Sequence, residues 1–171
     1  AEGRLNTRDT FALAESRDRD AKIALSGENG VSLHTTEAGA VGENNASVSV
    51  KSKNQSVATN RTDLLASNTI GAVENGTAKV TVEGKRNVSM NRSSAIAYSK
   101  NNDRSGNEAS VTVRTADNGG QDVSLTNSRL EEVATKPGAG ELEAGRVHTG
   151  ILVVCPAVEE LAVGDETGLL E

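Results

Sequence analysis

The chain has 171 residues, a net charge of -6 at pH 7, one Phe, one Tyr and no Trp. A chain of this length can bury about 70% of its unfolded surface in one domain, but with so few large side chains the core must be thin and regular, filled by Val, Ala, Ile and Leu. The negative charge and the scattered Lys and Arg exclude a nucleic-acid surface, which needs a basic patch with stacking aromatics, and no apolar run approaches the roughly 20 residues of a membrane span.

The first segment, residues 1–20, begins with the polar stretch AEGRLNTRD and continues into the apolar phrase Phe11-Ala12-Leu13-Ala14. A start at Ala followed by polar residues is typical of a mature protein after removal of a signal peptide, and a trimmed sequence would look the same. We therefore expect a protein secreted to the bacterial cell surface. The single Cys155 excludes an internal disulfide, and a bacterial exported protein without disulfides is compatible with that. This segment is expected to be a first strand or a strand that pairs with another subunit.

Residues 21–136 repeat three short phrases in the same order. The first phrase, Ala-x-Val-x-Val or a relative, begins at positions 21, 46, 78 and 109, so the repeat is about 31 residues long with a shorter first copy. The second, Val-Ser-Leu or a relative, begins at 31, 57, 88 and 123. The third is rich in Ala and begins at 11, 38, 70 and 95 and, less clearly, at 133. Asn and Gly between the phrases supply the positive φ that tight turns need.

Alternation of apolar and polar residues within each phrase predicts strands with one face in the core and one in water. We predict that the valines of the first phrase point inward: Val48, Val50, Val80, Val82, Val111 and Val113. The intervening hydroxyl residues are predicted to point outward: Ser47, Ser49, Thr81, Ser110 and Thr112. A shift of one residue in register would exchange the two faces.

Three short strands in each repeat predict an all-β fold, a β-solenoid of about four coils. Each coil would cover the inner face of its neighbour, and like residues would stack at about 4.8 Å. The alternative is an antiparallel β-sandwich, in which composition alone produces the alternation.

The C-terminal segment, residues 137–171, departs from the repeats. It begins with the linker-like PGAGE and contains the apolar run Ile151-Leu152-Val153-Val154. We expect either an atypical cap or a strand that pairs with another subunit.

Candidate catalytic and metal-binding residues are few, and we expect no enzyme, no cofactor and no metal. His34 and His148 are the only histidines, and Ser32 lacks the second Gly of a nucleophile elbow. Cys155 is expected to be a buried small hydrophobe. Asp122 follows a Gly-Gly pair, but a calcium-binding nonapeptide needs stacked copies of its motif.

Two further surface interpretations involve the polar residues. Six Asn-x-Ser/Thr sequons would be without meaning in a bacterium and would indicate a glycosylated surface protein in a eukaryote or an archaeon; they begin at Asn45, Asn54, Asn60, Asn75, Asn87 and Asn91. The outward Ser and Thr could also form an ice-binding row, but Lys22 and Lys79 interrupt it.

The repeats GENNASVSVKSKNQSVATN and ENGTAKVTVEGKRNVSMN resemble the curlin family, the secreted bacterial subunits of functional amyloid, including curlin-like holdfast-anchor proteins. The resemblance covers residues 21 to about 128. It implies export across the outer membrane and end-to-end assembly into a surface fibre that serves adhesion or biofilm.

We therefore predict a structural subunit that forms a homopolymer by head-to-tail contacts, with a cell-surface anchor as a second candidate partner. The predicted polymer interface consists of Phe11, Ala12, Leu13, Ile151, Leu152, Val153 and Val154. Pro156 and the acidic residues after it could instead fold back as a cap. The alternative function is a monomeric adhesin or glycan-binding module.

Overall fold

The computed structural model describes residues 3–17, 19–68, 76–99, 108–116, 122–134, 142–144 and 151–154. These residues form strands and turns, and no helix occurs among them. The strands are β1 (Leu5–Ser16), β2 (Ala21–Gly27), β3 (Val31–Gly42), β4 (Asn45–Ser52), β5 (Val57–Asn60), β6 (Asp63–Asn68), β7 (Thr77–Gly84), β8 (Val88–Asn91), β9 (Ser94–Ser99), β10 (Glu108–Thr115), β11 (Val123–Thr126), β12 (Ser128–Ala134), β13 (Leu142–Ala144) and β14 (Ile151–Val154).

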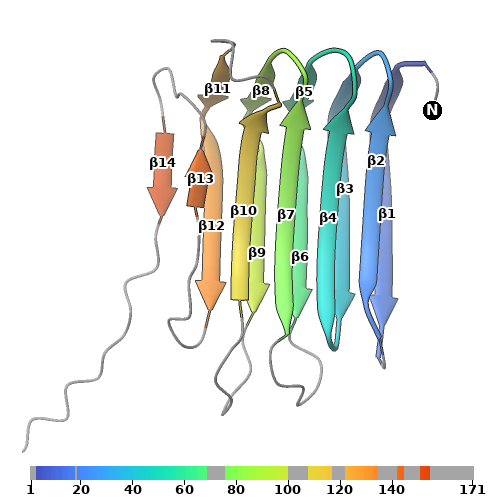
Figure 1. The fold of residues 1–171 in the computed structure, drawn as a ribbon, viewed down its shortest axis with the longest axis vertical. Coiled ribbons are helices and arrows are strands. Elements are labelled where there is room, and N and C mark those ends of the chain that lie inside the picture. The colour runs from blue at the N-terminus through green and yellow to red at the C-terminus, as the bar shows by residue number, and fades with distance from the viewer. Residues whose placement is uncertain are drawn as a thin grey trace, which may run out of the picture.

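The strands form two sheets that lie face to face (Figure 1). The nine-stranded sheet has the order β11-β8-β5-β3-β6-β9-β12-β14, and β1 also pairs with β3. The five-stranded sheet has the order β13-β10-β7-β4-β2. Strand pairing is parallel in both sheets. Strands from the beginning of the chain therefore lie at one end of the molecule, and β13 and β14 lie at the other (Figure 1).

The predicted β-solenoid of about four coils is wrong, and so is the β-sandwich alternative. The fold has parallel strands in a nearly closed, barrel-like sheet and a second sheet. The physical reason lies in β3, a single strand that includes the second and third phrases on either side of Thr35 and pairs with β5 before that residue and with β6 after it. The second and third phrases therefore belong to one sheet, and the parallel pairing excludes an antiparallel sandwich.

The predicted inward direction of the first-phrase valines is confirmed. Val48, Val80 and Val111 stand next to one another across β4, β7 and β10, as the repeat requires. All six predicted valines are at most 1% exposed. Like residues therefore stack on like, and the narrow core between the sheets needs no aromatic side chain.

The third phrase is placed differently from the prediction in two copies. The copy expected at residues 70–73 lies outside the described residues. The strand that pairs with the third phrase of β3 is β6, where Leu64 stands beside Ala38 and is fully buried. In the last copy the phrase was predicted to begin at Val133, but Val133 stands beside Tyr98. The residue that stands beside Ala95, the first residue of the preceding copy, is Leu130. The third-phrase row of the core thus mixes Ala and Leu.

A repeated corner separates the second phrase from the third. Its central residue has a φ of 47–49° in each copy, a left-handed conformation that is uncommon for residues other than Gly; these residues are Asp9, Thr35, Arg61, Arg92 and Asn127. The next residue is always Thr or Ser, and its hydroxyl donates a hydrogen bond to the carbonyl two residues back at 3.0–3.3 Å. Four of these hydroxyl residues are buried: Thr36, Thr62, Ser93 and Ser128.

Candidate functional site

The end of the molecule that carries β1 and β2 is incompletely covered. Leu5, Ala12 and Ala14 of β1 and Leu25 of β2 pack against the core but are only partly buried. The residues that stand beside them one strand further in are at most 2% exposed, for example Ala38 and Ala40. Four inner rows therefore lack a covering neighbour at this end, whereas Ala21 and Ile23 of β2 are buried. We call this the open end, defined by Leu5, Ala12, Ala14 and Leu25.

Two of the predicted interface residues flank the open end on the outer face of β1. Phe11 is 67% exposed and Leu13 is 55% exposed, whereas Ala12 between them points inward. Leu13 stands beside Gly39 of β3. Because Gly39 has no side chain, Cδ1 of Leu13 lies close to the β3 backbone at this position. Such large exposed apolar side chains on an edge strand are typical of a surface that another chain covers.

The other predicted interface segment, Ile151–Val154, is β14 at the opposite end of the nine-stranded sheet (Figure 1). It pairs in parallel with β12, with Ser128 beside Ile151. The fold therefore does not bring the two predicted interface segments together within one molecule. Cys155, Pro156 and His148 lie outside the described residues.

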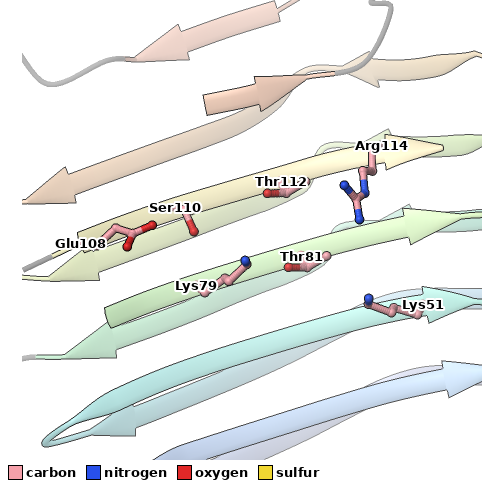
Figure 2. A pocket seen from close by; sticks show the side chains of 7 residues that line it. All are labelled: Lys51, Lys79, Thr81, Glu108, Ser110, Thr112 and Arg114. Atoms are coloured by element: carbon pink, nitrogen blue, oxygen red, sulfur yellow. The ribbon is translucent and has the colours of Figure 1, made fainter. Parts of the chain in front are cut away.

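The outer face of the five-stranded sheet contains a shallow hollow of about 220 Å³, which we call the β7–β10 hollow. Figure 2 shows its side chains projecting from β4, β7 and β10. They are Lys51, Lys79, Thr81, Glu108, Ser110, Thr112 and Arg114. The parallel register forms this cluster from repeats about 30 residues apart, with Lys79 beside Ser110 and Thr81 beside Thr112.

Two of the three cations around the hollow share one carboxylate. Nη2 of Arg114 lies 2.8 Å from Oε2 of Glu83, and Nζ of Lys51 lies 3.7 Å from Oε1 of the same residue. Lys79 forms no ion pair with any residue of the described chain. Among the three cations of the hollow, Lys79 is therefore the one whose charge no carboxylate of the described chain pairs.

The floor of the hollow carries two hydroxyls that were predicted to face water. Thr81 is 9% exposed and Ser110 is 7% exposed, because the longer side chains around the hollow shield them. Neither hydroxyl has a hydrogen-bond partner among the described residues. Both residues line the hollow, so their hydroxyls are available to a molecule that enters it.

A second hollow of about 380 Å³ adjoins the first along the same face. It extends across β2, β4 and β7, and it shares Lys51, Lys79 and Thr81 with the β7–β10 hollow. Lys22 of β2 also lines it, in the same row as Lys79 and separated from it by Ser47 of β4. Lys22 and Lys79 are thus two strands apart, or roughly 10 Å at the usual strand spacing.

The remaining sequence candidates are not brought together. His34 and Ser32 lie on β3, partly buried, and Asp122 directly precedes β11. Within the described ranges, no three His, Cys, Asp or Glu side chains are grouped as metal ligands. The same residues include no helix with the length and apolar character needed to cross a membrane.

Of the sequons, Asn75 lies outside the described residues, and Asn45 is tied into the fold. Its Nδ2 donates to Oδ1 of Asp20 at 2.8 Å, and its Oδ1 accepts from Oγ1 of Thr77 at 2.8 Å. A glycan on Nδ2 of Asn45 would break the first of these bonds.

Sequence reasoning found the outward hydroxyl row but missed both the hollow and the repeated corner. A Thr or Ser at the same place after each second phrase was the available signal for the corner. No family model, curated protein or solved structure matches this chain. Its function must therefore be argued from its own geometry.

Proposed function

We propose that this chain is a structural subunit that assembles head to tail into an extracellular filament, with a role in surface adhesion or biofilm. The observation that carries the proposal is the open end, where Leu5, Ala12, Ala14 and Leu25 remain partly exposed in rows that are otherwise closed. Strands added beside β1 and β2 would bury them, at a gain of about 25 cal/mol for each Å² of apolar surface.

The arrangement of the strands supports a contact that propagates. Both sheets are parallel and run from β1 and β2 at one end to β14 and β13 at the other. The end strands of one copy can therefore pair in parallel with β1 and β2 of the next. Such a heterologous contact does not close on itself, and it builds a filament.

The edge of β1 also supports pairing with another chain. It is 12 residues long, and its apolar phrase from Phe11 to Ala14 contains neither a charge nor a Pro. Natural edge strands that avoid association are usually short, charged or interrupted. The extracellular part of the proposal rests on the resemblance of the repeats to curlins, and immunogold labelling of producing cells tests it.

The experiment that tests assembly places a charge in the open end. In Ala14→Lys, the isolated subunit can extend the ammonium group into water past the edge of β1, but a following subunit would bury it. We expect this variant to fold and to remain monomeric, because an unpaired buried charge costs several kcal/mol. Negative-stain electron microscopy and sedimentation velocity of the full chain provide the measurement.

Asn6→Lys is the matched control, since Asn6 lies on the same strand and faces outward. It should form filaments like the unaltered chain. Deletion of residues 151–154 removes β14 and should also prevent filament formation while circular dichroism stays β-rich. Monomeric behaviour of the unaltered chain at high concentration, or filaments of Ala14→Lys, would contradict the proposal.

A further inference from the structure

The two unpartnered hydroxyls and the unpaired Lys79 occupy one hollow, and they indicate a ligand with matching groups. The Thr81 and Ser110 hydroxyls can each donate and accept a hydrogen bond. The Lys79 ammonium attracts an anion, while the Glu108 carboxylate at the rim of the hollow accepts hydrogen bonds only. A ligand that satisfies this set needs a negative charge and several hydroxyls close together.

We infer that the outer face of the five-stranded sheet binds an acidic polysaccharide, with an acidic group on Lys79 and sugar hydroxyls on Thr81, Ser110 and Glu108. Binding in the β7–β10 hollow does not depend on filament assembly, because that hollow is lined by β4, β7 and β10 and includes no residue of β1 or β2. A filament would repeat the site along its length and raise the avidity of each subunit.

The shape of the face favours a polymer over a small anion. The two hollows share Lys51, Lys79 and Thr81 and together cross β2, β4, β7 and β10. The cations are spread along this path, with Lys22 and Lys79 in alternate strands of one row. A site for one inorganic ion would instead have its cations converge on a point.

The same residues argue against a nucleic acid. No aromatic side chain lines either hollow, so bases have nothing on which to stack. The net charge of -6 would also repel a densely charged phosphate backbone. A sugar chain with acidic groups at wider intervals fits the isolated Lys79 better.

The test is affinity electrophoresis of the full chain in gels that contain polygalacturonate, dextran sulfate or neutral dextran. We expect retardation by at least one of the two acidic polymers and none by dextran, and the polymer that retards the chain identifies the acidic group as carboxylate or sulfate. Lys79→Gln should weaken the retardation by about threefold to tenfold, since exposed charge pairs are individually weak. The double variant Thr81→Val with Ser110→Ala should weaken it as well, although its charge is unchanged.

Arg86→Gln is the control, because it removes the same charge from an exposed turn outside both hollows. It should bind like the unaltered chain. Equal loss in Arg86→Gln and Lys79→Gln would overturn the inference by indicating general charge attraction. Equal retardation by dextran, no retardation by any polymer, or equal competition by single-stranded DNA would overturn it too.

Discussion

The backbone N–H of Thr62 donates a hydrogen bond of 3.2 Å to Oγ of Ser93, 31 residues later in the chain. The same oxygen accepts a second bond from Oγ1 of Thr59 at 3.0 Å, and it donates to the carbonyl of Asn91 at 3.0 Å. One buried hydroxyl thus holds its own corner in shape and joins it to the corner of the preceding repeat.

Removal of that hydroxyl should be costly. Ser93→Ala leaves the buried N–H of Thr62 and the hydroxyl of Thr59 without this acceptor, and we expect a loss of about 1–3 kcal/mol in the free energy of unfolding. Urea denaturation followed by circular dichroism provides the measurement. Ser89→Ala, at an exposed position on the neighbouring strand, should change stability by less than about 0.5 kcal/mol. Equal effects of the two changes would show that the corner hydroxyl is not structural.

The left-handed residue of the corner should respond to the shape of its side chain. Arg92 is exposed and has a φ of 48°. Asn tolerates this conformation well, whereas a β-branched residue does not. We therefore expect Arg92→Asn to be at least as stable as the unaltered chain and Arg92→Val to be less stable by about 1–2 kcal/mol. Thermal unfolding of the three proteins tests the order, and a Val variant as stable as the Asn variant would contradict it.

Two glycines of β3 should differ sharply when replaced by Ala. A Cβ on Gly42 would lie 2.3 Å from the backbone oxygen of Asn45, so the turn into β4 would have to move. A Cβ on Gly39 would meet Cδ1 of Leu13 at 3.5 Å, which is an ordinary contact. We expect Gly42→Ala to cost about 1–3 kcal/mol and Gly39→Ala to be neutral or stabilising by a few tenths of a kcal/mol. Denaturant midpoints of the two variants provide the comparison.

The hydroxyls of the β7–β10 hollow should behave in the opposite way to Ser93. Thr81 and Ser110 are buried without a hydrogen-bond partner in the described chain. Thr81→Val and Ser110→Ala should therefore leave the free energy of unfolding unchanged or raise it by up to about 1 kcal/mol, because no hydrogen bond within the described chain is lost. A loss of more than 1 kcal/mol in urea denaturation would mean that these hydroxyls stabilise the fold.

The sequence by itself determined which residues of the first phrase face the core. Alternation with a period of two assigns each side chain to one face, so Val48, Val80 and Val111 could be placed inward and in register from the repeat alone. The same alternation predicted that the Ser and Thr residues between the valines of each strand point outward and form a row on the opposite face. The apolar runs Phe11–Ala14 and Ile151–Val154 were also predicted as strands, and they belong to β1 and β14 at opposite ends of the nine-stranded sheet.

Only the tertiary structure decided how the strands are grouped and which outer residues form a site. Alternation is a local property, and it does not show that β3 continues through two phrases and pairs with both β5 and β6. That grouping depends on the left-handed corner and on buried hydroxyl bonds between residues about 30 positions apart, such as Thr62 and Ser93. The hollow has the same origin, because the shielding of Thr81 and Ser110 arises from long side chains on three different strands.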